Sequence, residues 1–344
     1  MMVKKLGIIG TLFFLLLVIS SSGAASSPAI RSEEVRFSNM QVELAGTLLL
    51  PLGKEPFAAI VFLHGSGCST RKDLQPVAEA LVERGHAALI FDKRGCGAST
   101  GSWVASSLFD LAADAQAALR YLASRPEVDP ARVGLWGISQ SGWITPIVAS
   151  RSERASFLIV VTGGGASPRE VEMFGYEQQL RRQEIVDEEM EAARKLLDTY
   201  FAYLATGKGR DSLLDLIAAA KEQTWYSALN IERVLPSETS RPAWEWVATY
   251  DPSLDIKNIT IPTLVLLGAK DDSSPIQVTA TRWITGLAQT GVSRSRVVIF
   301  PEAGHGLTVG GHHGHRASRQ YVPGYFSEVA NWLQFVLQAP AKAP

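Results

Sequence analysis

Residues 132–143, which read RVGLWGISQSGW, decide how the rest of the chain is interpreted. Val133 to Trp136 are predicted to form a buried strand, Gly137 to Ser141 a tight turn, and Gly142 to Ala149 the start of an apolar helix. On a sharp strand-to-helix turn, a serine hydroxyl projects out of the sheet and the next backbone N–H groups point toward the space in front of it. Ser139 is therefore a candidate nucleophile.

The turn departs from the pattern G-x-S-x-G at one position. Its fifth residue is Ser141, and the glycine falls one place later, at Gly142. Glycine suits such corners because a side chain would collide with the neighbouring strand and helix, and serine is small enough to keep the close approach. The pentapeptide alone is a weak signal, and an ordinary glycine-rich turn is the alternative interpretation. Its place between a strand and a helix favours the catalytic interpretation.

The length and charge of the chain limit the kinds of partner it can have. A chain of 344 residues can form one large domain or two ordinary ones with a real core. The net charge is -1, so there is no electrostatic reason to expect nucleic acid or an anionic membrane surface as partner. We expect a small-molecule substrate.

Residues 1–25 are predicted to be a signal peptide. Two lysines precede an apolar run from Leu6 to Ile19, and small residues follow it. The run is short for a membrane span, and cleavage after Ala24 or Ala25 fits the small-residue rule. An uncleaved N-terminus that tethers the protein to a membrane is the alternative. In both cases we expect the catalytic chain to be exported, in the periplasm or secreted.

Apolar β-rich runs alternate with helical patterns along most of the chain. An antiparallel hairpin is predicted from Val35–Phe37 and Val42–Leu50, joined by Ser38 and Asn39. Further strands are predicted at Ala58–Leu63, Ala87–Phe91, Phe157–Val161, Thr263–Leu267 and Arg296–Phe300, and helices at Asp73–Arg84, Leu108–Ala123, Ile276–Leu287 and Tyr325–Leu337. This alternation indicates an α/β fold with a parallel sheet covered on both faces.

The alternation stops between residues 168 and 252. This segment is helical and charged on one face, with the clearest helices at Met173–Tyr203 and Ser212–Trp225. Its two ends return to the same sheet, so we interpret it as a lid inserted into a core of residues 33–167 and 253–338; a free-standing helical domain is the alternative. Three tryptophans of the segment could line a pocket, but the core is the favoured place for them: Trp225, Trp244 and Trp246.

Several polar residues follow strands of the predicted sheet. Loops at the carboxyl ends of parallel strands share one edge, so groups far apart in sequence converge there. Ser139, the pair Asp271 and Asp272, His305 and the turn 64–67 all stand at such ends. A serine hydroxyl needs a histidine to take its proton, and the histidine needs a carboxylate to fix its tautomer. We therefore expect a serine, a histidine and an aspartate to meet at this edge, in the chain order Ser, Asp, His.

With these residues in place, the chain resembles the α/β-hydrolase superfamily from Val35 to Leu337, apart from the helical insertion. It closely resembles bacterial ester hydrolases of the feruloyl-esterase-like and dienelactone-hydrolase-like branch. The motifs that carry the resemblance are LAGTL at 44–48, HGSG at 64–67, DKRGCGASTG at 92–101 and GISQSGW at 137–143. The resemblance implies a mostly parallel sheet with an N-terminal antiparallel hairpin, helices on both faces and a helical lid insertion.

The resemblance also implies which carboxylate is the third member of the triad. In the family pattern this acid stands three residues after a strand-end glycine and four before a proline. Asp271 satisfies both relations, to Gly268 and Pro275, and Asp272 is the rival. The triad is thus expected to be Ser139, Asp271 and His305.

The same resemblance implies roles for the turns around the nucleophile. The N–H groups of Gln140 and Ser66 are expected to form the oxyanion hole. Cys68 and Cys96 lie just beyond adjacent strand ends of the family sheet, so they are a possible disulfide in an oxidising compartment, with two free thiols as the alternative.

The remaining histidines are given no catalytic role. His64 is expected to hold its turn rather than act as a base. His312, His313 and His315 form a tract that could suggest a metal, but no other ligands stand at a known spacing, so a solvated loop is favoured. We expect no cofactor and no metal.

The expected function is a serine carboxylic-ester hydrolase that acts on small to medium acyl or aryl esters. A serine peptidase of the prolyl-oligopeptidase-like type is one alternative, although such enzymes usually carry a large additional N-terminal domain. A non-catalytic binding protein on a hydrolase scaffold is another. The sequence does not specify the acyl group, the alcohol group or the oligomeric state.

Overall fold

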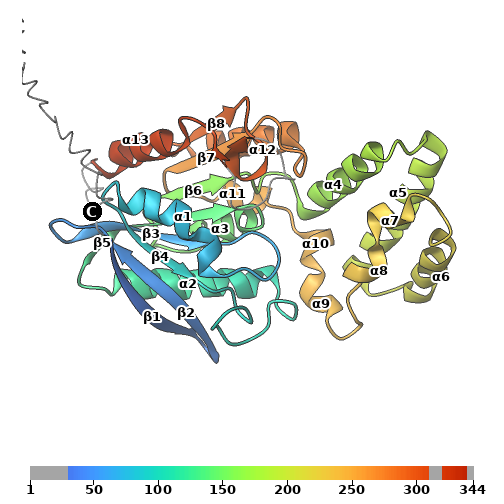
Figure 1. The fold of residues 1–344 in the computed structure, drawn as a ribbon, viewed down its shortest axis with the longest axis horizontal. Coiled ribbons are helices and arrows are strands. Elements are labelled where there is room, and N and C mark those ends of the chain that lie inside the picture. Colours follow the sequence, from blue (N-terminus) through green and yellow to red (C-terminus); the bar gives the residue numbers. More distant parts are fainter. Residues whose placement is uncertain (1–29, 310–319, 339–344) are drawn as a thin grey trace, which may run out of the picture.

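A central sheet organises the computed structural model, which describes residues 30–309 and 320–338. Within these residues, eight strands form one sheet in the order β1-β2-β4-β3-β5-β6-β7-β8 (Figure 1). The strands are β1 (Arg31–Asn39), β2 (Val42–Leu50), β3 (Phe57–Leu63), β4 (Ala87–Phe91), β5 (Val128–Ile138), β6 (Leu158–Val161), β7 (Thr263–Gly268) and β8 (Arg296–Phe300). In this spatial order, the strands from β4 through β3 to β8 run parallel to one another, whereas β2 is antiparallel to both β1 and β4. The predicted fold class is confirmed.

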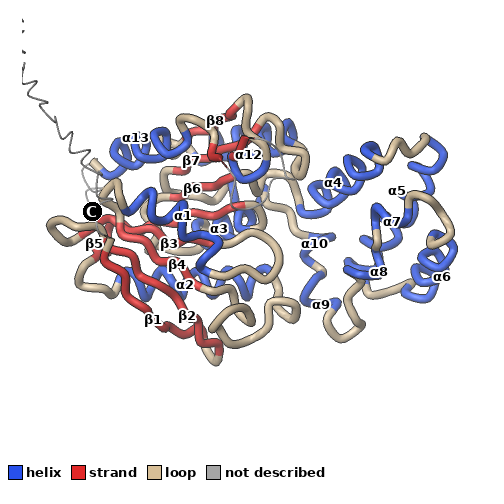
Figure 2. Tube along the Cα trace, viewed as in Figure 1, coloured by secondary structure: helices blue, strands red, loops and turns tan. Residues whose placement is uncertain are grey.

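Apolar residues on both faces of the strands bury the centre of the sheet. Every residue of β3 and β4 is buried, as expected of parallel strands covered on both sides. One face packs on α2 (Leu108–Ala123), α3 (Ser141–Ala149) and α12 (Ile276–Thr290). The other face packs on α1 (Arg71–Val82) and α13 (Tyr325–Leu337). The sheet therefore separates two hydrophobic cores. Figure 2 shows the strands of the sheet with helices around them.

The N-terminal hairpin turns at a different place from the predicted one. The turn consists of Met40 and Gln41, while Ser38 and Asn39 remain in β1 and pair with β2. Ser and Asn favour turns because their side chains bond to nearby backbone. Here the Asn39 side chain instead donates a hydrogen bond of 2.8 Å to Asp114, so the strand continues through it.

Residues 168–252 are mainly helical and pack around a hydrophobic cluster of their own. The helices are α4 (Pro168–Arg182), α5 (Asp187–Thr206), α6 (Arg210–Ala220), α7 (Tyr226–Leu229), α8 (Ile231–Val234), α9 (Arg241–Trp244) and α10 (Trp246–Thr249). The short helix α11 (Ser253–Ile256) leads back to β7. In Figure 1 the helices α4 to α8 lie to one side of the sheet, beyond the ends of its strands.

The prediction of one helix over Met173–Tyr203 is wrong, because the helix is interrupted between α4 and α5. Glu184 adopts a left-handed conformation with φ 57°. The next helix begins with three acidic residues in its first turn, where the partial positive charge of a helix N-terminus stabilises them. The second predicted helix, Ser212–Trp225, ends early, at Ala220.

Near the carboxyl end of the chain, β9 (Thr308–Val309) and β10 (Gln320–Tyr321) form a small antiparallel pair. The predicted signal peptide and the tract of His312, His313 and His315 lie outside the described residues. Among the helices that the structure describes, none is long and apolar enough to cross a membrane.

Candidate active site

Ser139 lies on a sharp turn between β5 and α3. Its φ of 56° is in the left-handed region, which costs a non-glycine residue about 1–3 kcal/mol and is found mainly at functional sites. The loop after β6 approaches this turn so closely that a Cβ on Gly163 would lie 2.2 Å from the Ser139 carbonyl oxygen. The surrounding backbone therefore holds the turn, and the half-buried Ser139 lines a cavity.

The structure explains why the motif accepts serine at its fifth position. The Ser141 hydroxyl donates a hydrogen bond to the carbonyl oxygen of His64, so it connects the nucleophile turn to the turn after β3. The next residue has no such freedom, because a Cβ on Gly142 would lie 2.3 Å from the carbonyl carbon of Gly163.

Asp271 and His305 meet at the ends of β7 and β8. The Nδ1 atom of His305 lies 2.9 Å from Oδ2 of Asp271, whose side chain is only 2% exposed. The other carboxylate oxygen of Asp271 accepts a 2.8 Å hydrogen bond from the Ser273 N–H. The rival, Asp272, points to Arg182 and forms an ion pair of 2.9 Å. Of the two aspartates, Asp271 is thus the partner of the histidine.

One cavity of about 380 Å³ brings the predicted residues together. Ser139, His305 and Ser66 all line it, although they come from three different strand ends. The rest of its wall includes residues of the helical insertion: Val171, Glu172, Gly175, Tyr176, Gln179 and Arg182. The insertion therefore covers the edge of the sheet where the candidate triad lies.

The predicted oxyanion donors have N–H groups that are free to bind. Among the described residues, neither the Ser66 nor the Gln140 backbone N–H donates a hydrogen bond. Two such groups, beside and opposite Ser139, are what stabilisation of a developing oxyanion requires.

Lys93 holds both of these turns, and sequence reasoning did not single it out. Its ammonium donates to the carbonyl oxygens of Gly65 and Gly67, on either side of Ser66, the second at 2.9 Å, and to Oε1 of Gln140 at 3.1 Å. The side chain is buried, and burial lowers its pKa from 10.5 to about 8. The only sequence signal was its place in the DKRG motif directly after a buried strand.

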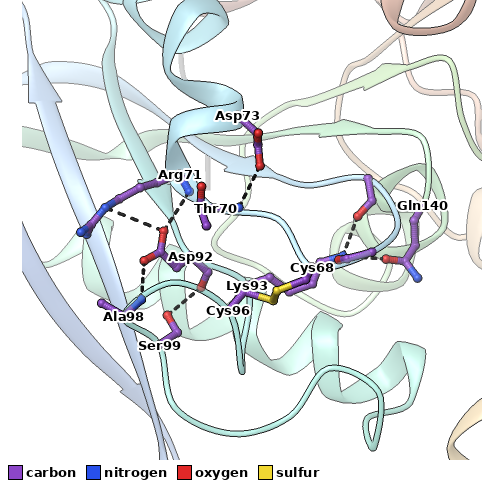
Figure 3. Close-up of a disulfide and its surroundings, with 12 residues drawn as sticks. Cys68, Thr70, Arg71, Asp73, Asp92, Lys93, Cys96, Ala98, Ser99 and Gln140 are labelled. Atoms are coloured by element: carbon purple, nitrogen blue, oxygen red, sulfur yellow. Dashed lines mark hydrogen bonds and ion pairs between the residues drawn. A yellow bond between two sulfur atoms is a disulfide. The ribbon is translucent and has the colours of Figure 1, made fainter. Parts of the chain in front are cut away.

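A disulfide joins the loop that carries Ser66 to the loop that carries Lys93. Cys68 and Cys96 are bonded, and they lie beside Lys93 and Gln140 in Figure 3. The Lys93 N–H also donates to the carbonyl oxygen of Ser69 at 3.1 Å. The loop that carries Ser66 is thus fixed both covalently and by hydrogen bonds.

His64 is buried, and its ring does not gain a proton near neutral pH. Burial, and next the charge of Lys93, lower its pKa from 6.5 to about 3, so the ring is neutral at physiological pH. Its ring packs edge-on against Phe91. This placement agrees with a role in holding the turn.

A second cavity, of about 520 Å³, adjoins the first. We call it the tryptophan cavity, because four tryptophans line it: Trp103, Trp143, Trp244 and Trp246. Ser66, Trp143, Glu172 and Tyr176 line both cavities. Trp244 and Trp246 therefore pack against the core of the insertion and also line a cavity, whereas Trp225 is buried in that core.

Comparisons with known proteins agree with this architecture. A family model described as "Alpha/beta hydrolase family" matches residues 60–318. The quorum-quenching protein AidA of Acinetobacter baumannii is 33% identical over 129 residues, which cover 37% of this chain and 42% of that protein. Esterase EstD of Thermotoga maritima is 23% identical over 276 residues, which cover 76% of this chain and 57% of that protein. The chain thus matches less than two thirds of the length of either relative.

Among solved structures, the Pyrococcus furiosus esterase Pf2001 superimposes with a TM-score of 0.59. The superposition covers 90% of this chain and 92% of that one, at 16% sequence identity. A likeness at this level of identity bears on the fold alone.

Proposed function

This chain belongs to the alpha/beta hydrolase family, and we propose that it is a serine carboxylic-ester hydrolase for small to medium acyl or aryl esters. The observation that carries the proposal is the hydrogen bond of 2.9 Å between His305 and Asp271, next to the cavity that His305 shares with Ser139. The esterase EstD among the relatives supports the reaction type. The feruloyl-esterase-like or dienelactone-hydrolase-like branch stays a prediction.

In the proposed mechanism, the Ser139 hydroxyl oxygen attacks the ester carbonyl carbon while Nε2 of His305 takes its proton. Asp271 accepts from Nδ1–H, so it fixes the tautomer and stabilises the imidazolium. The N–H groups of Ser66 and Gln140 bind the oxyanion, and each such donor typically lowers the barrier by roughly 2.7–4 kcal/mol.

The tetrahedral intermediate collapses when the C–O bond to the alcohol breaks and His305 returns the proton to the departing oxygen. Water then attacks the acyl group on Ser139, again giving its proton to His305. The acid leaves when the proton passes back to the serine oxygen. The protein therefore ends each cycle in its starting protonation state.

The test compares wild type with Ser139→Ala on p-nitrophenyl acetate. The substitution should lower kcat by several orders of magnitude, and a fluorophosphonate should label wild type but not the variant. Retained hydrolysis in Ser139→Ala would exclude Ser139 as nucleophile. Cleavage of aminoacyl-nitroanilides in preference to esters would indicate a peptidase, and a protein that neither labels nor hydrolyses would be a binding protein on this scaffold.

We also propose that the protein is exported and that residues 168–252 act as a lid. The disulfide between Cys68 and Cys96 supports export, because such bonds persist mainly in oxidising compartments. The lid role is supported by the insertion residues that line the cavity with Ser139. Edman sequencing of the protein recovered from the periplasm or medium should give an N-terminus near residue 25, whereas an intact N-terminus in the membrane fraction would indicate a tether.

A further inference from the structure

The walls of the tryptophan cavity form a continuous aromatic surface. The ring centroids of Trp103 and Trp244 are 6.0 Å apart, those of Trp244 and Trp246 are 6.4 Å apart, and those of Trp246 and Trp143 are 5.9 Å apart. Tyr176 and Tyr200 extend the wall. The face of an aromatic ring carries partial negative charge, so it attracts a cation held within about 6 Å.

Glu172 contributes a carboxyl group at the junction of the two cavities. Among the described residues, no hydrogen bond or ion pair reaches this carboxyl. Desolvation by the surrounding protein atoms raises its pKa, although the side chain is still exposed to solvent. Glu172 and Tyr176 lie four residues apart on α4, and Tyr200 lines the same cavity. The carboxylate therefore stands beside the aromatic wall at a place that a cationic ligand can reach from solution.

Among the described residues, no cationic side chain forms an ion pair with Glu172. Arg182 lines the first cavity with it but pairs with Asp272 at 2.9 Å. Arg233 lines the tryptophan cavity but is exposed to solvent. Lys93 lies 6.0 Å from the Trp103 ring centroid, with its ammonium bonded to three oxygens of the oxyanion turns. The Glu172 carboxylate is therefore available to a cationic ligand at this junction.

We propose that the tryptophan cavity binds the alkylammonium group of a cationic ester, with Glu172 as its counter-ion. This proposal rests on the esterase function proposed above and names its preferred substrates. The ester carbonyl lies at Ser139 while the ammonium group enters past Trp143 and Glu172, which line both cavities. Glu172 is a specificity-determining residue in this arrangement and takes no part in bond breaking.

The kinetic test compares acetylcholine with its neutral carbon isostere, 3,3-dimethylbutyl acetate. In wild type, kcat/KM for the choline ester should exceed that for the isostere by roughly tenfold, mainly through KM. Glu172→Gln keeps the shape of the side chain and should bring the ratio of the two kcat/KM values near one, mainly by raising KM for the choline ester. The control, Glu188→Gln, removes an exposed carboxylate of α5 and should keep the wild-type ratio. A ratio near one in wild type, or an unchanged ratio in Glu172→Gln, overturns the proposal.

A binding test separates this proposal from the esterase function. Tryptophan fluorescence of Ser139→Ala is titrated with choline and with neutral 3,3-dimethylbutanol. Choline should bind more tightly, and adding Glu172→Gln should weaken choline binding roughly tenfold while leaving the alcohol unchanged. If choline binds in this way but wild type hydrolyses no ester, the cation site stands and the esterase function fails. If p-nitrophenyl acetate is hydrolysed but choline binds no better than the alcohol, the cation site fails alone.

Discussion

His305 and Asp271 share a hydrogen bond of 2.9 Å, while the adjacent Asp272 forms an ion pair with Arg182. Two neighbouring carboxylates thus have separate partners, and substitution can tell them apart. Asp271→Asn should lower kcat for p-nitrophenyl acetate by roughly 10³- to 10⁴-fold, because the histidine would be held in the wrong tautomer. Steady-state kinetics at pH 7 would measure the loss.

Asp272→Asn is the matched control. It removes an ion pair whose side chains are 49% and 40% exposed, so stability should change by at most about 1 kcal/mol and kcat should stay within a few fold. A larger loss of kcat in Asp272→Asn than in Asp271→Asn would reverse the assignment of the triad acid.

Lys93 is predicted to position both oxyanion donors. Lys93→Met removes the hydrogen bonds to Gly65, Gly67 and Gln140, so kcat should fall roughly ten- to hundredfold with a smaller change in KM. A role in folding alone would lower the amount of active enzyme but leave kcat per active site unchanged. Active-site titration with a fluorophosphonate separates the two outcomes.

The same lysine predicts an alkaline limit to activity. Its pKa in the folded protein is lowered from 10.5 to about 8, so above pH 8 the amine loses a proton and one of its donors. Wild-type kcat should decline above pH 8, and this decline should be missing in Lys93→Met. The free energy of unfolding should change in the opposite direction to kcat. Between pH 8 and 10.5 the unfolded chain binds more protons at this lysine than the folded protein does, so the contribution of Lys93 to the free energy of unfolding rises with pH. An identical alkaline decline in the variant would argue against the assignment.

The disulfide is predicted to stabilise the folded protein. Cys68 and Cys96 are 28 residues apart, and closing a loop of that length in the unfolded chain corresponds to about 3–4 kcal/mol. The double variant Cys68→Ser/Cys96→Ser should lose this amount in urea unfolding. With reductant, the free energy of unfolding of wild type should fall to that of the variant, and reductant should not change the value for the variant. Equal stability of oxidised and reduced wild type would contradict the prediction.

The sheet was predictable from sequence because its signals are local. β4 and β8 have the predicted bounds, and β3 and β6 differ by one residue, since a continuous apolar run between turn residues leaves little choice. The candidate triad was predicted from the same strands, because their carboxyl ends share an edge. The choice of Asp271 over Asp272 came from the family pattern rather than from local chemistry.

The contacts around the triad were less predictable, because they join distant segments. A lysine after a strand normally reaches solvent, and only the approach of the turns at Gly65 and Gln140 buries Lys93. The sequence did not distinguish a core position from a cavity wall for Trp244 and Trp246, and in the fold they pack against the core and line a cavity. Glu172 looked like one more charge on a helical surface until the fold placed it at the cavity junction.

Glu170 and Arg282 connect the helical insertion to the core. Arg282 of α12 donates to both carboxylate oxygens of Glu170 in α4, at 2.6 and 2.8 Å. This pairing is the main reason why the pKa of Glu170 is lowered from 4.5 to about 2. A carboxyl whose folded pKa is depressed contributes stability above its unfolded pKa, and that contribution is lost as pH falls from 4.5 toward 2. The side chains are 31% and 40% exposed, so the gain should be about 1 kcal/mol or less.

Glu170→Gln should therefore lower the free energy of unfolding by up to about 1 kcal/mol at pH 7, and the difference from wild type should shrink at pH 3. Urea unfolding at the two pH values measures it, with Glu222→Gln as a control that removes an exposed acid in the turn after α6. Glu170 also accepts a hydrogen bond from the Ser167 N–H at the start of α4. If glutamine forms this hydrogen bond less well, part of the loss in unfolding free energy remains at low pH. A difference of equal size at both pH values would assign the whole effect to this helix cap and none to Arg282.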